Sequence, residues 1–342
     1  MLYLVTGATG LVGNNVVRLL VERGQAVRVL ARNPTDKSLA GLPLDTVAGD
    51  VCDPDAVGRA VEGADRIIHA AARVHLGWTG LELQHSVNVE GTRNVANAAM
   101  KAGVRMIHVS SVDALGLGSR SQPADEECPP EGSVLCPYVV TKRAAERTLT
   151  QLVADGLDAV IVNPVYMFGP WDWKPSSGRM ILEVARGWAL LAPPGGNDFA
   201  DVRDVAAGIL AAAERGQRGR RYILGGEPLS YLEAWRMIAD VVGVRGPRRR
   251  MLRPGLFIAG RFGDLWAKVR GVEGDINSAA IAMSRLEHHY SYARAAAELE
   301  YRPRPARGAI EAAWEWFVDH GYAERRKPRA TSIPAAGREP ER

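Results

Sequence analysis

The sequence begins with a short apolar segment, LYLV, which is followed by glycines at positions 7, 10 and 13. A strand that leads through a glycine-rich turn into a helix presents free backbone N–H groups to an anion. In such a turn Gly7 allows the tight bend, Gly10 lets a pyrophosphate approach the backbone, and Gly13 lets the helix pack close to the strand. The segment therefore predicts a βαβ unit that binds a dinucleotide.

The alternation of strand-like and helix-like segments predicts the fold class. The apolar strand segments show little polar alternation, which is typical of strands buried on both faces. We therefore predict an α/β fold with a Rossmann-type doubly wound parallel sheet, formed by residues 1–165 and rejoined by 200–225. Residues 166–199 and 226–323 are predicted to form a smaller, mostly helical C-terminal substrate-binding lobe. The basic tail, 324–342, is predicted to be disordered.

The composition excludes several function classes. The formal net charge of +4 is modest, so we expect no nucleic-acid partner. Cys52, Cys128 and Cys136 have no metal-ligand spacing, and the histidines form no HExxH motif, so we expect no metal site and no disulfide framework. No apolar run is long enough to span a bilayer, and the first strand starts too close to Met1 for a signal peptide. We therefore expect a cytoplasmic protein.

The segment PYVVTK places Tyr138 and Lys142 four residues apart at the start of a predicted helix, on one helical face. A free tyrosine titrates near pH ~10 and is a poor base at neutral pH. A nearby ammonium favours the phenolate and lowers the pKa of the phenol. The tyrosine could then take a proton from an alcohol while a hydride leaves the same carbon. A solvated surface pair is the alternative, because this spacing is common.

Several motifs occur in an order that resembles the extended short-chain dehydrogenases/reductases, the group that includes NAD-dependent epimerases and dehydratases. The resemblance runs from Met1 to about Tyr322 and is carried by TGATGLVG, GDVCD, HAAA, NVEGTRN, VSSVDALG, YVVTK, NPVYMFGP, DVRDVA and YRPRP. Within that group the chain is most similar to the branch of hydroxysteroid dehydrogenases and dihydroflavonol-type reductases. The segments GPWDWKPSSGRM and RYILGGE also resemble the hopanoid-associated sugar epimerase family.

The resemblance implies a catalytic set of Ser111, Tyr138 and Lys142, in which the serine orients the substrate oxygen and the lysine also holds the nicotinamide ribose. Ser110 and Ser111 end a predicted strand, at the edge where ligands bind in open α/β sheets. Asn88 matches the family asparagine behind the site, although capping of the predicted helix 82–102 is the alternative. The predicted cofactor-binding residues are Gly7, Thr9, Gly10, Leu11, Val12, Arg32, Asp50, Val51, Ala70, Ala71, Asn88, Ser110, Tyr138, Lys142, Asn163 and Val165.

Arg32 follows the second predicted strand, at the position where NAD enzymes usually place an acid on the adenine-ribose hydroxyls. An arginine can instead bind a 2′-phosphate through charge-assisted hydrogen bonds. The sequence therefore favours NADP(H). Asp36 lies close enough in the chain to keep NAD(H) as the alternative.

Aromatic residues are frequent at the expected substrate positions, among them Trp78, Phe168, Trp171 and Trp173. The segment 251–270 adds an apolar stripe with arginines beside it, made of Leu256, Phe257, Phe262, Leu265 and Trp266. Such a stripe usually belongs to a core. If it is exposed, it could admit a lipophilic substrate or make peripheral contact with a membrane surface.

Three functions follow from these patterns. The favoured one is an NAD(P)-dependent oxidoreductase that interconverts an alcohol and a ketone on a hydrophobic small molecule, such as an isoprenoid, steroid-like or polycyclic metabolite. The second is a nucleotide-sugar epimerase or dehydratase that retains its cofactor, with Arg179 and Arg203 contacting the sugar diphosphate. The third is a non-enzymatic nicotinamide sensor. The resemblance also implies a homodimer formed through the helix that carries Tyr138.

Overall fold

The computed structural model describes residues 1–187, 189–274 and 277–325. Its centre is a seven-stranded parallel sheet with the order β10-β6-β5-β4-β1-β2-β3. The strands are β1 (Leu2–Thr6), β2 (Ala26–Ala31), β3 (Asp45–Ala48), β4 (Arg66–His69), β5 (Arg105–Val109), β6 (Ala159–Pro164) and β10 (Arg221–Leu224). The strand order reverses between β1 and β4, which confirms the predicted doubly wound sheet and places its switch point beside the glycine turn. The predicted disordered tail lies, from residue 326 onward, outside the described residues.

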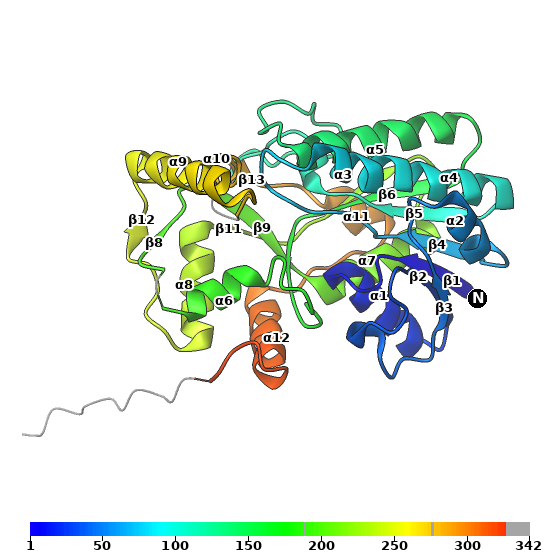
Figure 1. Cartoon of the computed structure of the whole chain (residues 1–342), viewed down its shortest axis with the longest axis horizontal. Helices are drawn as coiled ribbons and strands as arrows, with labels where there is room; N and C mark the ends of the chain where they lie inside the picture. Colours follow the sequence, from blue (N-terminus) through cyan, green and yellow to red (C-terminus); the bar gives the residue numbers. More distant parts are fainter. Residues whose placement is uncertain (188, 275–276, 326–342) are drawn as a thin grey trace, which may run out of the picture.

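Helices cover both faces of this sheet (Figure 1). Helices α1 (Leu11–Glu22) and α7 (Val202–Arg215) pack together on one face, and α2 (Pro54–Val61), α4 (Gly91–Ala102) and α5 (Pro137–Ala154) pack on the other. Within β1, Tyr3 and Val5 face the first layer while Leu4 faces the second, and all three are buried. Burial on both sides explains why these strands carry no polar alternation.

The predicted helix 82–102 is present but is not uniform. It consists of α3 (Leu81–His85), the π-helical segment η2 (Ser86–Glu90) and α4, and it ends at Gly103 in the left-handed conformation. A π-helical turn shifts the side chains that follow it relative to a regular helix, and such turns are frequent at functional sites. Here the turn carries Asn88.

A second, smaller sheet lies beside the first. It consists of β7 (Tyr166–Phe168), β9 (Gly196–Asp201), β11 (Glu227–Ser230) and β13 (Glu287–His288). Helices α6 (Arg179–Ala185), α8 (Tyr231–Val242) and α12 (Ala306–Asp319) pack around it on a core that includes Phe168, Phe199, Ile238 and Phe317. The remaining elements are η1 (Lys37–Leu39), η3 (Val112–Ala114), β8 (Leu191–Ala192), β12 (Arg249–Arg250), α9 (Arg253–Arg270), α10 (Ser278–Met283) and α11 (Ala293–Glu298). The exact domain boundaries stay a prediction.

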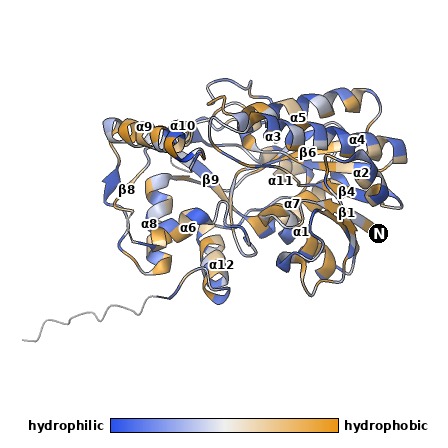
Figure 2. Cartoon of the chain, in the orientation of Figure 1, coloured by the Kyte–Doolittle hydropathy of each residue, from blue (hydrophilic) through white to orange (hydrophobic). Residues whose placement is uncertain are grey.

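The apolar stripe of segment 251–270 forms α9, and the expectation that it is core is wrong for four of its five residues. Leu256 is 2% exposed, whereas Phe257, Phe262, Leu265 and Trp266 are all at least half exposed. Figure 2 shows hydrophobic residues alternating with hydrophilic ones along α9, which lies at the edge of the molecule. The reason is that α9 packs mainly on α10, and no other layer of the described chain covers its outer side. Among the described residues, no helix is long and apolar enough to cross a membrane.

The contact between the glycine turn and α1 predicts the effect of one substitution. A Cβ at Gly13 would lie 2.2 Å from the Gly7 carbonyl oxygen, which is backbone and cannot move aside cheaply. Gly13→Ala should therefore lower the free energy of unfolding by about 1–3 kcal/mol or more, measured by urea denaturation. Gly58→Ala is the matched control, since Gly58 lies in helix α2 with open space around it; it should be neutral or stabilising by up to ~1 kcal/mol. Equal effects of the two changes would contradict this packing.

Candidate active site

The glycine turn forms a cradle at the switch point of the sheet. Gly7 has a φ of +74°, and a Cβ there would lie 2.5 Å from the backbone of Ala70, so no larger residue fits. Gly10 precedes α1, and no side chain caps the first turn of that helix. Uncapped N–H groups beside a turn without side chains suit a pyrophosphate. The residues present therefore fit a bound dinucleotide.

The other predicted cofactor-binding residues lie along the same edge of the sheet. They follow or end successive strands, so the parallel topology brings segments distant in sequence to one line. Asp50 and Val51 follow β3, Ala70 and Ala71 follow β4, Ser110 follows β5, and Asn163 and Val165 lie at or just after the end of β6. Thr9, Gly10, Leu11 and Val12 complete the line at the turn and the start of α1.

Arg32 lies just after β2 with its side chain 80% exposed, and its Nε is 3.8 Å from an Asp50 carboxylate oxygen. Asp36 is turned elsewhere: its carboxylate accepts hydrogen bonds from the Ser38 N–H and hydroxyl and from Lys174 Nζ at 3.1 Å. Of these two side chains, Arg32 is therefore exposed and Asp36 is largely covered. A phosphate near the end of β2 would meet Arg32 first.

Ser111, Tyr138 and Lys142 meet where β5 ends and α5 begins. Tyr138 and Lys142 lie in the first turns of α5, and both are buried. Ser111 lies close enough to the Tyr138 phenol for its side chain to affect the pKa of that phenol. Lys142 Nζ donates to the Val109 carbonyl oxygen at 3.0 Å. The structure thus brings the three predicted catalytic residues to one place, and the alternative of a solvated surface pair is wrong.

Burial dominates the protonation of this group. It raises the pKa of Tyr138, the negative charge of Asp113 raises it further, and the Ser111 hydrogen bond opposes the shift. The expected lowering of this pKa is therefore wrong for the chain by itself, because burial of the phenolate and the Asp113 charge raise it. Burial also lowers the pKa of Lys142 to about 8, against the attraction of Glu146 and Asp113. Tyr138 is therefore a neutral phenol that holds its proton at neutral pH.

A buried hydrogen-bond network supports Ser111 from behind. Glu146 Oε1 accepts from the Ser110 hydroxyl at 2.5 Å and from Asn163 Nδ2 at 2.7 Å, while its Oε2 accepts from Arg221 Nε at 2.9 Å. Asn163 Nδ2 also donates to the Ser111 carbonyl oxygen at 2.8 Å. The side chains of Ser110 and Asn163 therefore hold the backbone that carries Ser111. Their contact with a cofactor stays a prediction.

Asn88 does not cap a helix. Its Oδ1 accepts from the Arg73 N–H at 2.7 Å, and its Nδ2 donates to the Arg73 carbonyl oxygen at 3.1 Å and to Thr141 Oγ1 at 3.0 Å. Thr141 directly precedes Lys142 in α5. Asn88 therefore ties the loop after β4 to the catalytic helix, and the capping alternative is wrong.

The structure adds two polar side chains to the site, Asp113 and His288, which were not among the residues expected from the sequence. Asp113 accepts a hydrogen bond from the Ser111 hydroxyl at 3.0 Å, and His288 Nε2 is 3.9 Å from the Asp113 carboxylate. His288 is buried, and burial lowers its pKa although Asp113 opposes the shift. The position of Asp113 two residues after Ser111 was a usable signal. His288 had none, because β13 reaches the site only through the tertiary fold.

The expected aromatic lining is mostly core. Trp171 and Trp173 pack against Trp316 of α12, and Phe168 stacks on Phe199 at 5.4 Å between ring centroids. Phe168 is fully buried, whereas Trp171 and Trp173 are only partly buried against this core, so the expected substrate contacts of the two tryptophans stay a prediction. Trp78 is half exposed and remains at the rim.

The pKa of Lys142 predicts a pH dependence of stability. Between pH 8 and 10.5 the unfolded chain holds a proton on this lysine that the folded chain has released, so stability rises with pH in that window. Lys142→Met removes this contribution. The difference in unfolding free energy, wild type minus variant, should increase by about 2 kcal/mol from pH 8 to pH 10, measured by urea denaturation of the cofactor-free protein. Lys101→Met, on the exposed side of α4, is the control; the same slope for both variants would contradict a buried Lys142.

Comparisons with known proteins agree with this geometry. Residues 3–225 match the NAD dependent epimerase/dehydratase family. The chain is 35% identical to a putative dihydroflavonol 4-reductase of Synechocystis sp. over 94% of this chain and 96% of that protein. It is 36% identical to sterol demethylase protein B of Methylococcus capsulatus, over 76% of this chain and 80% of that protein. Among solved structures, a nucleoside-diphosphate-sugar epimerase from Pseudomonas aeruginosa is 25% identical with a TM-score of 0.78, covering 94% of this chain and 99% of that one. The chain is an oxidoreductase that belongs to the NAD-dependent epimerase/dehydratase family, among the extended short-chain dehydrogenases/reductases.

Proposed function

We propose that this enzyme interconverts an alcohol and a ketone on a hydrophobic small molecule, of the isoprenoid, steroid-like or polycyclic kind. The observation that carries the proposal is the meeting of Ser111, Tyr138 and Lys142 at the carboxyl end of β5. A nicotinamide bound along this edge of the sheet would supply or accept the hydride. In reduction, Tyr138 donates its proton to the ketone oxygen while Ser111 orients that oxygen. In oxidation, Tyr138 takes the proton back.

The rim of the site supports a hydrophobic substrate. The loop after β4 and the start of α3 expose five large apolar side chains, which are Val74, Leu76, Trp78, Leu81 and Leu83. A group of apolar side chains left in water often marks a surface that binds an apolar partner. Two of the relatives named above, a dihydroflavonol reductase and a sterol demethylase component, have names that point to polycyclic compounds.

A second candidate is a nucleotide-sugar epimerase that retains its cofactor, and the similar structure from Pseudomonas aeruginosa favours it. Such an enzyme needs basic side chains for the sugar diphosphate. Arg203, one of the two residues expected for this role, is held by Asp201, with Nη2 2.6 Å from the carboxylate. That pairing leaves less of its charge for a phosphate, so the observation favours the first candidate.

Cofactor turnover distinguishes the two candidates. With lipophilic ketones, loss of absorbance at 340 nm in proportion to ketone is expected. Tyr138→Phe should lower kcat by about 10²–10⁴-fold without loss of cofactor binding, because the proton donor is removed and the packing is kept. Tyr222→Phe is the control. Tyr222 lies in β10, outside the site, and its buried hydroxyl donates a hydrogen bond to Glu298 of α11. Conversion of a nucleotide sugar to its isomer, with the cofactor retained and no net oxidation, would reject the reductase and support the epimerase.

We further propose that NADP(H) is preferred, with Arg32 binding the 2′-phosphate. Arg32→Ala should raise KM for NADPH by about 10–100-fold, as expected for the loss of a charge-assisted phosphate contact, and should change KM for NADH little. Arg23→Ala removes an arginine that also lies on the surface, at the end of α1, and should change neither KM. Equal losses with both cofactors in Arg32→Ala, or a wild-type preference for NADH, would reject this role.

A further inference from the structure

The outer face of α9 carries an apolar stripe that is exposed to solvent. Its central members are Ile258, Phe262, Leu265 and Val269, spaced so that they lie on one side of the helix. Val272, one residue past the Gly271 end, is also exposed. Phe257, Trp266 and Leu252 widen the stripe. A contiguous apolar surface of this kind is uncommon on a protein that functions entirely in water.

The inner face of α9 explains why the outer one is left open. Leu256 is buried, and a Cβ at Gly260 would lie 3.1 Å from Ser278 Cα, so the two helices α9 and α10 touch closely along this side. Asp264 Oδ1 accepts a hydrogen bond from the Ser278 N–H at 2.9 Å. The helix is therefore fixed by one narrow side, and the stripe lies on the opposite side.

Basic side chains flank the stripe. Between residues 248 and 272 the sequence contains seven arginines and lysines and one acidic residue, Asp264, which faces α10. The Arg261 guanidinium lies over the Phe257 ring at 5.4 Å, and the Arg270 guanidinium lies over the Trp266 ring at 5.0 Å. Aromatic and aliphatic side chains bordered by cations match the boundary between acyl chains and anionic lipid headgroups. A second copy of this face would bring like charges together, which opposes a two-fold contact through it.

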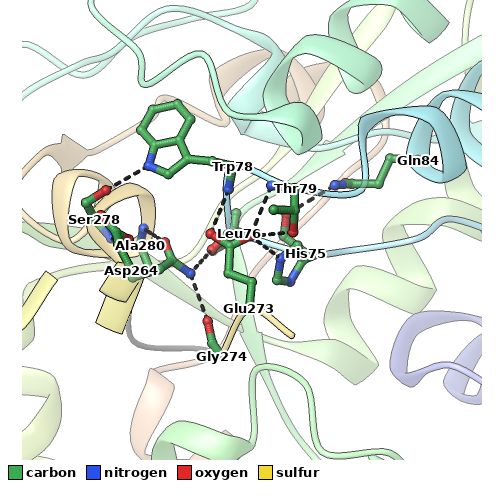
Figure 3. Close-up of polar contacts among 11 residues, drawn as sticks. His75, Leu76, Trp78, Thr79, Gln84, Asp264, Glu273, Gly274, Ser278 and Ala280 are labelled. Atoms are coloured by element: carbon green, nitrogen blue, oxygen red, sulfur yellow. Dashed lines mark hydrogen bonds and ion pairs between the residues drawn. The ribbon is translucent and has the colours of Figure 1, made fainter. Parts of the chain in front are cut away.

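The pair of helices α9 and α10 contacts the site through the loop 75–79 and through the buried cluster around Tyr138. Glu273, just after α9, accepts hydrogen bonds from the Trp78 and Thr79 N–H groups at 2.9 and 3.0 Å and also pairs with His75 Nε2 at 3.0 Å (Figure 3). Trp78 Nε1 donates to the Ser278 hydroxyl at 2.8 Å. In addition, α10 packs two apolar side chains into the buried cluster that contains Tyr138, namely Ala279 and Met283. The stripe is therefore carried by the same unit that borders the catalytic tyrosine.

We propose that α9 lies in the surface of an anionic membrane, with its apolar stripe in the headgroup–acyl boundary and its arginines and Lys268 on the lipid phosphates. Docking in this way holds the apolar loop 74–83 close to the bilayer, so that a lipophilic substrate reaches the site from the lipid. This delivery step rests on the proposed function. The docking itself does not, because it depends only on the stripe and its charges.

The test is co-sedimentation of the full chain with vesicles of phosphatidylglycerol and phosphatidylcholine, compared with vesicles of phosphatidylcholine alone. Binding to the anionic vesicles should be at least about 10-fold stronger and should weaken with added salt. The double variant Phe262→Ser and Leu265→Ser should lose binding by about 10-fold or more, and Arg261→Ser with Lys268→Ser should lose the preference for anionic lipid. Met100→Ser, which removes an exposed apolar side chain of α4, is the control and should bind as the wild type does.

Other outcomes overturn the proposal. Absence of binding to both vesicles would reject docking. Normal vesicle binding by the Phe262→Ser and Leu265→Ser variant would also reject docking. If the same substitutions convert a dimer to a monomer in light scattering, a second copy of the chain covers this face and the proposal is likewise rejected. Each variant is first compared with the wild type in thermal unfolding, so that misfolding is recognised. Vesicle binding needs neither cofactor nor substrate. If vesicles bind but no lipophilic ketone is reduced, the proposed function fails and the docking stands.

Discussion

The rest of the site depends on one buried positive charge, the Lys142 ammonium, which the surrounding groups must compensate. Removing an ammonium from water is costly, and the pKa of about 8 reflects that cost. The charge is tolerated because the Val109 carbonyl oxygen accepts its hydrogen bond and because Glu146 and Asp113 lie near it. Those partners come from a central strand, a covering helix and the turn between them. The parallel sheet with helices on both faces therefore supplies the groups that stabilise the buried lysine.

The same low-dielectric surroundings decide the state of Tyr138. Burial and the Asp113 charge keep the phenol protonated, so it holds the proton that reduction of a ketone requires. In the opposite direction the phenolate needs a compensating positive charge, and an oxidised nicotinamide bound beside it would be one such charge. Asp113 and His288 thus belong to the electrostatics of the site, although neither was part of the expected catalytic set.

Hydrogen bonds between segments distant in sequence hold the border of this group together. Asn88 ties the loop after β4 to α5, and Glu273 ties the continuation of that loop to the end of α9. A carboxylate that accepts several hydrogen bonds favours its charged form, and the pKa of Glu273 is lowered to about 2 although burial opposes this. The loop, the α9–α10 pair and the catalytic helix therefore form one connected border of the site.

Several features could be predicted from the sequence because they depend on spacing over a few residues. They are the glycine turn before α1, the alternation that gives the parallel sheet, and the pairing of Tyr138 with Lys142 on one helical turn. The rest depended on what covers each group. An apolar stripe has the same periodicity whether it is buried or exposed, so only the packing of α9 on α10 showed that its outer face meets solvent. In the same way His288 and the pKa of Tyr138 were decided by chain segments far away in sequence, since desolvation and charge act through space and not along the chain.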